Sequence, residues 1–299
     1  MKLEERRLQV MKKFRCIIVG LLTLVMIAGA VCMMTPQSSL KVQAAAGSSV
    51  KTLAENKTYK SFDITGNGKA DSLKVSVKEK DGKVIYKLLV NGNKKYTYSA
   101  DPIMEAAEFK ALTLKNGRTY IYIGIYGWDD QGVFGIYGMK NGKFKRLADL
   151  NHVRGLDEYG YSLTADVKTV EDNNITITYY QNSYLTGLIS YEYVYTYKDG
   201  GLKLASSNAK VTGVNHVRTG LKGRSLTTSR KIDMYKTAGS DEKVSAIKAG
   251  QKVTFLYVKG TKTGTWYKVK AGGITGWIKA LDEMPETENY WFKDLEYTI

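Results

Sequence analysis

The chain has 299 residues, with 45 Lys and Arg against 29 Asp and Glu, a formal charge of +16, and 43% hydrophobic residues. This is the composition of a folded protein, and it excludes a disordered chain. With 22 tyrosines, 29 glycines and three prolines, it favours β-structure with many tight turns.

The N-terminus has the pattern of an export signal over residues 1–44. A basic stretch that ends at Arg15 precedes 18 uncharged residues, 17–34. Val42 and Ala44 then satisfy the small-residue rule for cleavage after Ala44. The alternative is an uncleaved anchor, because 18 apolar residues nearly span a bilayer. Contact with a membrane is expected only in that case.

Cleavage after Ala44 would remove both cysteines and leave a net charge of +11 on residues 45–299. Export together with this charge predicts a secreted, wall-associated protein of the Gram-positive type, with peptidoglycan or anionic wall polymers as partners. Nucleic acid is the usual partner of a basic chain, but export makes it a poor prediction here.

Residues 45–57 are predicted to be a linker, and residues 58–212 an all-β domain because their apolar residues alternate with period two. This domain is expected to be propeller-like or a sheet sandwich. One short helix is predicted from Asp101 to Phe109, with Asp101 as N-cap and proline next. Hairpin turns are predicted at four dipeptides that tolerate positive φ: Asp81-Gly82, Asn91-Gly92, Asn141-Gly142 and Asp199-Gly200.

Tyrosines alternate along residues 191–197, at every second position. They form either a sheet face packed beneath other elements or an exposed platform for carbohydrate. Because the intervening side chains are mixed polar, the tyrosine side is predicted to face inward. Residues 213–223 are then predicted to be a second linker.

The stretch from Asp63 to Asp71 spaces oxygen-bearing side chains around glycines, a pattern that suits Ca²⁺. It resembles the calcium loops of FG-GAP and other propeller-type repeats. The alternative is an Asx/Gly turn without an ion. Two carboxylates predict weak affinity, about 10⁻⁴–10⁻³ M. The candidate ligands are Asp63, Thr65, Asn67, the Lys69 carbonyl and Asp71.

Residues 224–282 carry three motifs in order. These are K-x-G-x-x-V-T from Lys248 to Thr254, W-Y-K-V from Trp266 to Val269, and G-W-I at 276–278. Together they resemble the bacterial SH3-like (SH3b) family. The segment 259–265 is longer than is usual in that family.

The resemblance implies a small SH3-like β-barrel that holds a secreted protein on peptidoglycan. Trp277 is expected in its core. Because Trp266 and Tyr267 are adjacent in a strand, at least one of them is expected to be partly exposed. The candidate ligand-binding residues, each with a packing role as the alternative, are Tyr235, Tyr257, Trp266 and Tyr267.

The last segment, 283–299, is acidic and aromatic. It is predicted either to fold back over the basic body or to remain a loose terminus. We predict no enzyme, because the chain after Ala44 lacks a cysteine nucleophile, a serine-hydrolase motif and histidine-rich zinc ligation. A calcium-binding surface adhesin or scaffold is the alternative function, and a peptidoglycan hydrolase is a further one.

Overall fold

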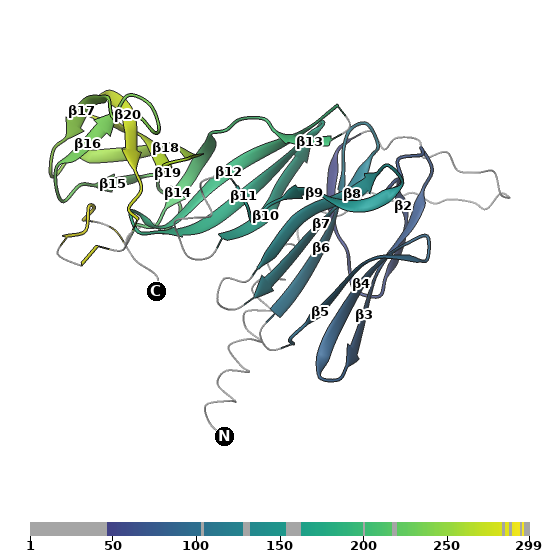
Figure 1. The fold of residues 1–299 in the computed structure, drawn as a ribbon. Helices are drawn as coiled ribbons and strands as arrows, with labels where there is room; N and C mark the ends of the chain where they lie inside the picture. The colour runs from purple at the N-terminus through teal and green to yellow at the C-terminus, as the bar shows by residue number, and fades with distance from the viewer. Residues whose placement is uncertain are drawn as a thin grey trace, which may run out of the picture. The chain divides into compact units, whose positions relative to one another are not determined.

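The computed structural model describes residues 47–102, 105–127, 132–153, 163–199, 201–216, 220–282, 285–286, 289–293 and 295 (Figure 1). The expected signal segment lies outside these residues. The described residues form strands and turns with no α-helix, so the prediction of an all-β protein is confirmed. No helix able to span a membrane occurs in this part of the chain.

The first sheet has four antiparallel strands in sequence order. Two of its turns contain Asp81-Gly82 and Asn91-Gly92, with φ between 51° and 76° at these four residues, so the predicted turn chemistry is confirmed there. The strands are β2 (Thr58–Phe62), β3 (Asp71–Lys80), β4 (Lys83–Val90) and β5 (Asn93–Ala100).

The second sheet has five antiparallel strands in the order β1-β6-β7-β8-β9. The predicted helix from Asp101 to Phe109 is wrong, because β6 pairs with β7 and buries Phe109, and this pairing outweighs a local capping signal. The linker prediction for 45–57 is also wrong at β1, which pairs with β6. The strands are β1 (Ser49–Thr52), β6 (Glu105–Thr113), β7 (Thr119–Gly127), β8 (Val133–Lys140) and β9 (Lys143–Asp149).

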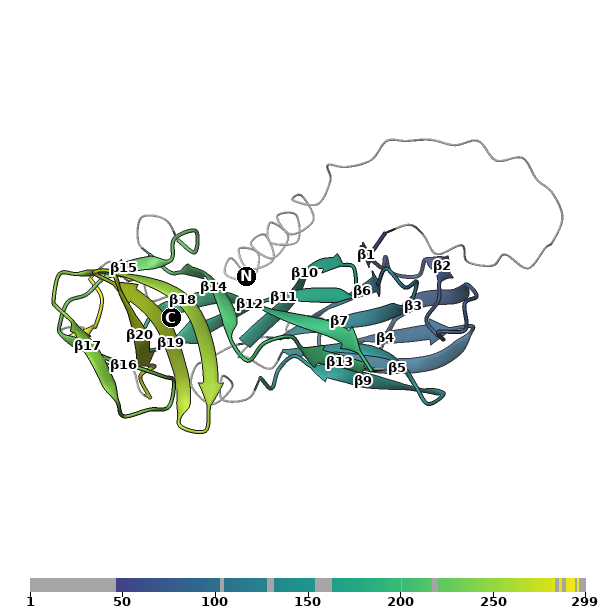
Figure 2. The same cartoon turned by 90° about the horizontal axis from the view of Figure 1, so that it is seen from above.

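Both faces of β7 are buried. Its isoleucines, such as Ile123, join the hydrophobic cluster beneath the four-stranded sheet, whereas Tyr120 and Tyr122 join a larger cluster on the other face. Figures 1 and 2 both draw β7 between the four-stranded sheet and β10. The five-stranded sheet is therefore a middle layer with a core on each side.

The third sheet has eleven strands in the path β10-β11-β12-β14-β18-β19-β20-β16-β17, with β13 paired to β12 and β15 to β18. No closed barrel is found among the described strands, so the small C-terminal barrel that the SH3b resemblance implies is not confirmed, and β14 joins these strands to the rest of the sheet by pairing with β18. Their bounds are β10 (Leu163–Glu171), β11 (Asn174–Ser183), β12 (Gly187–Lys198), β13 (Gly201–Leu204), β14 (Ala209–Val214), β15 (Ser225–Thr227), β16 (Ile232–Tyr235), β17 (Lys243–Ile247), β18 (Lys252–Thr261), β19 (Gly264–Ala271) and β20 (Ile274–Lys279).

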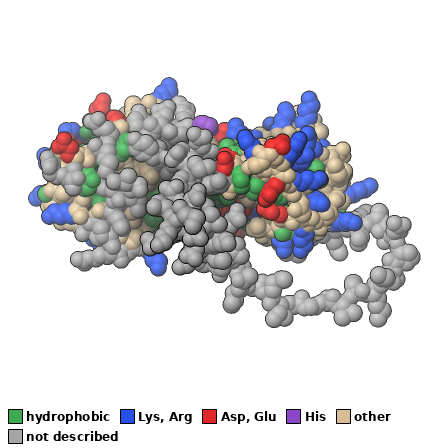
Figure 3. Space-filling view, turned by 90° about the horizontal axis from the view of Figure 1, so that it is seen from below, with side chains coloured by type: hydrophobic (Ala, Val, Ile, Leu, Met, Phe, Trp, Pro, Cys, Tyr) green, Lys and Arg blue, Asp and Glu red, His purple; other side chains and the backbone are tan. Residues whose placement is uncertain are grey.

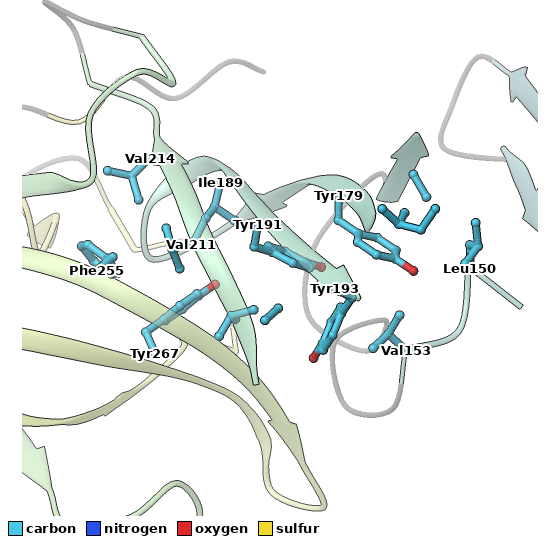
Figure 4. Close-up of a cluster of buried hydrophobic side chains, with 14 of the residues drawn as sticks. Leu150, Val153, Tyr179, Ile189, Tyr191, Tyr193, Val211, Val214, Phe255 and Tyr267 are labelled. Atoms are coloured by element: carbon cyan, nitrogen blue, oxygen red, sulfur yellow. The ribbon is translucent and has the colours of Figure 1, made fainter. Parts of the chain in front are cut away.

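The tyrosines of β12 face inward, as the sequence predicts. Tyr191, Tyr193 and Tyr195 are buried, and the Tyr191 ring stacks on Tyr179 with a centroid distance of 5.5 Å. Figure 4 shows this cluster together with Tyr267 of β19. The two hydrophobic clusters lie entirely within residues 53–292, so a chain that begins at Ala45 retains the whole described core.

The described part of the C-terminal tail folds back on the C-terminal strands. Phe292 is buried, with its ring centroid 5.6 Å from that of Phe255. The Lys293 amide donates a hydrogen bond to the Thr227 carbonyl at 2.8 Å. Of the two predictions for this segment, these contacts support folding back.

Candidate functional site

Four side chains form a continuous row on the outer face of the C-terminal strands. In the strand register, Tyr257 of β18 is opposite Lys268 of β19, Lys268 is opposite Trp277 of β20, and Trp277 is opposite Tyr235 of β16. Directly paired residues point to the same face of a sheet. The row crosses four strands and therefore spans about 14 Å. We call it the aromatic row.

A second row lies beside the first. Lys259 is opposite Trp266, which is opposite Lys279. The Tyr235 and Trp266 rings meet edge to face with centroids 5.5 Å apart. The structure thus brings three of the four predicted ligand-binding aromatics, Tyr235, Tyr257 and Trp266, onto one face.

Exposure differs between the tyrosine at one end of the aromatic row and the tryptophans in and beside it. Tyr257 is 40% exposed, but Trp266 and Trp277 are only 5% and 8% exposed. The indole of Trp266 donates a hydrogen bond to Thr263 Oγ1 at 3.2 Å. A Cβ on Gly239 would lie 3.6 Å from the same oxygen, so the β16–β17 loop packs beside Trp266. The tryptophans form a floor, and the ligand-accessible part begins at Tyr257.

Tyr267 is turned to the opposite side of β19. It is 2% exposed, and its hydroxyl donates a hydrogen bond to Ser183 Oγ at 3.0 Å. Burial raises the pKa of this hydroxyl to about 12. The expectation that Trp266 or Tyr267 is partly exposed is therefore wrong. Strand alternation does place them on opposite faces, but the outer face at Trp266 is itself covered.

Cations surround the aromatic row. Lys268 Nζ lies 6.0 Å from the ring centroid of Trp277, at the limit of a cation–π contact. Lys279 forms an ion pair with Asp282 at 2.9 Å. The carboxylate on this side of β16, Asp233, is bound to Lys243 at 2.6 Å, and this hydrogen bond lowers the Asp233 pKa. The negative charge of Asp233 is thus balanced by Lys243, so the row offers rings and the positive charge of Lys268 to a ligand.

A separate depression of about 480 Å³ opens at one end of the C-terminal strands. Met234, Ala271 and Ile274 supply its apolar lining, and Ile274 is 47% exposed. Lys248 is the one charged residue among those that line it. Alternation alone could not predict this depression, because it forms between two turns and a strand end.

The loop predicted to bind calcium is held together by its own hydrogen bonds. The Asp63 carboxylate accepts from the amides of Gly66, Asn67 and Gly68 at 2.6–3.1 Å. Asp71 Oδ2 accepts from the amides of residues 64 and 65, both at 2.8 Å. The other Asp71 oxygen, Oδ1, accepts from the Asn91 side-chain amide at 2.7 Å.

A permanent cation also packs on this loop. A Cβ on Gly66 would lie 2.8 Å from the Arg118 guanidinium. The carboxylate oxygens already receive N–H donors, and a positive group packs on the same loop, so the donor set fits an Asx/Gly turn better than a cation site. The predicted ligands Thr65, Asn67 and Lys69 lie in the same loop. Calcium binding stays an untested sequence-based prediction that these contacts do not favour, and an experiment in the Discussion distinguishes the two.

A charged cluster around the buried Lys110 joins the middle layer to the third sheet, and the sequence did not single it out. Lys110 Nζ lies 2.5 Å from Asp166 and 3.0 Å from Glu108, while its side chain is 9% exposed. Burial acts to lower the Lys110 pKa, but the two carboxylates together raise it above the usual value. The hydroxyl of Tyr122 beneath it donates to the Ala165 carbonyl at 2.5 Å. These contacts fasten β6 and β7 to β10.

No group of three or more His, Cys, Asp or Glu side chains that could hold a metal occurs among the described residues. His152 Nδ1 lies 3.1 Å from Asp149. A glycosidase would need two carboxylates. The acidic pairs that the sequence offers for this role, Asp129-Asp130 and Asp157-Glu158, lie outside the described residues.

No family model, curated protein sequence or solved structure shows significant similarity to this chain.

Proposed function

We propose that this chain is an exported, wall-associated, non-enzymatic binding protein whose C-terminal SH3-like module, residues 224–282, holds peptidoglycan. The observation that carries the proposal is the aromatic row with its interleaved lysine. For residues 58–212 we favour the predicted sandwich over the propeller. The core on both faces of the five-stranded sheet supports this choice.

The row suits glycan chains that bear acidic groups. The exposed ring of Tyr257 can lie against the apolar face of a sugar, as aromatic rings do in carbohydrate sites. Lys268, next in the row, can pair with a carboxylate of the stem peptide or of the sugar. The surface is an open sheet face and not an enclosed cavity, which favours a long polymer over a small molecule.

Residues 224–282 are not an independent unit in this fold. Strand β14 pairs with β18 through Ala209–Val258 and Lys210–Tyr257, and one hydrophobic cluster continues from Leu112 to Phe292. A truncation before residue 224 would expose that cluster, so point variants are the better test.

The test is co-sedimentation of residues 45–299 with peptidoglycan sacculi that have been stripped of anionic polymers, at low and at high salt. The proposal predicts pelleting at both, because ring contacts are not screened by salt. If high salt abolished pelleting, charge alone would account for the binding, and the proposal would be overturned. Release of soluble muropeptides during incubation would instead support the hydrolase alternative.

A further inference from the structure

The outer face of the four-stranded sheet carries a dense set of lysines. Side chains alternate across β3 and β4, and Leu73, Val75, Leu88 and Val90 are buried in the core. The other side of β3, β4 and β5 therefore faces outward. Its positively charged residues are Lys74, Lys78, Lys80, Lys83, Lys87 and Lys94.

The strand register makes these lysines neighbours. Lys80 is directly opposite Lys83, and Lys87 is opposite Ser76, so it lies diagonally between Lys74 and Lys78. Diagonal neighbours on a sheet lie about 7–8 Å apart. From Lys74 to Lys80 the positive track runs for about 20 Å along β3. Figure 3 shows Lys and Arg gathered on the right of the view, the side on which Figure 1 draws these strands.

This face contains no acidic residue to balance the charge. The remaining outward positions of β3, β4 and β5, all described, are serine, threonine, isoleucine and leucine. Of the six lysines only Lys80 has an ion pair among the described residues, at 4.0 Å with Asp81 of the adjoining turn. Like charges placed directly opposite in a sheet destabilise it. A bound polyanion would relieve that repulsion.

Some lysines elsewhere in the structure have acidic partners. Lys168 binds Glu192 at 2.6 Å on the third sheet, and Lys115 binds Asp172 at 3.0 Å. What distinguishes the four-stranded sheet is that its outward lysines share one face on which no outward strand position of β3, β4 or β5 is acidic.

We propose that this lysine face binds a flexible linear polymer of phosphodiester-linked polyols, one of the anionic polymers of a cell wall. Each ammonium acts as a point charge for a phosphate. The face offers no tyrosine, phenylalanine or tryptophan at an outward position, so it lacks the stacking platform on which single-stranded nucleic acids bind. The choice of a wall polymer rests on the proposed location at the wall.

The test measures binding of residues 45–299 to purified poly(glycerol phosphate) over a range of salt concentrations. The variant combines Lys74→Gln, Lys78→Gln and Lys87→Gln. The control combines Lys145→Gln, Lys222→Gln and Lys252→Gln, three exposed lysines outside this face that remove the same charge. Single-stranded DNA of equal charge and anionic lipid vesicles are the comparison ligands.

We expect the face variant to lose at least about ten-fold in affinity at low salt, and the slope of log K against log salt to fall by about 2, while the control changes by much less. Equal losses in both variants, or none in either, would overturn the proposal. Tighter binding to DNA or to vesicles than to poly(glycerol phosphate) would overturn the assigned ligand. Retention on stripped sacculi reports the aromatic row, so the two proposals fail separately.

Discussion

The hydroxyl of Tyr267 in β19 donates a buried hydrogen bond to Ser183 Oγ of β11 at 3.0 Å, across 84 residues of sequence. The W-Y-K-V motif therefore divides its two aromatic residues between two tasks. Trp266 faces the outer surface beside the aromatic row, whereas Tyr267 joins the C-terminal strands to the large core. The proposed function therefore predicts that stability and ligand binding can be separated by substitution at these two faces.

Replacing Tyr267 by phenylalanine should lower stability without changing wall binding. The ring remains to fill the core, and only the hydrogen bond is lost, at a cost of about 1 kcal/mol. Urea unfolding of wild type and Tyr267→Phe measures the difference. Weaker sedimentation with sacculi at unchanged stability would show that Tyr267 contacts ligand after all.

Alkaline pH should destabilise the fold. Burial raises the pKa of Tyr267 from 10.0 to about 12, so between these values the folded state keeps a proton that the unfolded state releases. Stability is then fully present below pH 10 and falls as pH rises toward 12. Ionisation of Tyr267 in the unfolded state accounts for a loss of about 2 kcal/mol in the free energy of unfolding by pH 12. Urea unfolding across this range should show a smaller loss in Tyr267→Phe than in wild type.

The Lys110 cluster should act as a structural clamp. Lys110→Met would leave Glu108 and Asp166 facing each other without their shared cation. Because Asp166 is 42% exposed, we expect a loss of about 2 kcal/mol, below the 3–5 kcal/mol typical of a fully buried pair. Adding Asp166→Asn and Glu108→Gln to Lys110→Met should recover part of that loss in urea unfolding. No recovery would contradict a charge-based clamp.

The Asp63–Asp71 loop should be indifferent to calcium. Asp63→Ala would remove the acceptor of three backbone amides and cost about 2 kcal/mol. The thermal midpoint of wild type should be the same in millimolar calcium and in chelator, and the variant should be destabilised equally in both. A calcium-dependent rise in wild type that vanishes in Asp63→Ala would establish the cation site.

Local sequence patterns were sufficient to predict several of the strands and turns. The alternation at 191–197 and the Asn-Gly and Asp-Gly dipeptides encode face and turn directly, so the burial of Tyr191 and the positive φ of Asn91 and Asn141 follow from them. The failure at Asp101–Phe109 has the opposite cause. A capping signal is local, but the choice of strand there depends on pairing with β7, which is distant information.

The candidate site was predictable only in part. The motifs pointed to Tyr235, Tyr257 and Trp266, which the register places on one face. They could not show that Trp266 is covered on the outer face, because the residues that cover it come from the β16–β17 loop and from Thr263. Nor could they show Lys110 meeting Asp166, because the two residues are 56 positions apart and meet only between sheets.

The most direct test of the account uses two exposed tyrosines on β-strands. Tyr257 in the aromatic row and Tyr180 on β11 are 40% and 39% exposed, so replacing either by alanine should cost similar stability. Dissociation constants for stripped sacculi are measured for residues 45–299 carrying Tyr257→Ala or Tyr180→Ala. We predict at least about ten-fold weaker binding, ~1.4 kcal/mol, for Tyr257→Ala and no change for Tyr180→Ala. Unchanged binding in Tyr257→Ala, or an equal loss in both variants, would contradict the account.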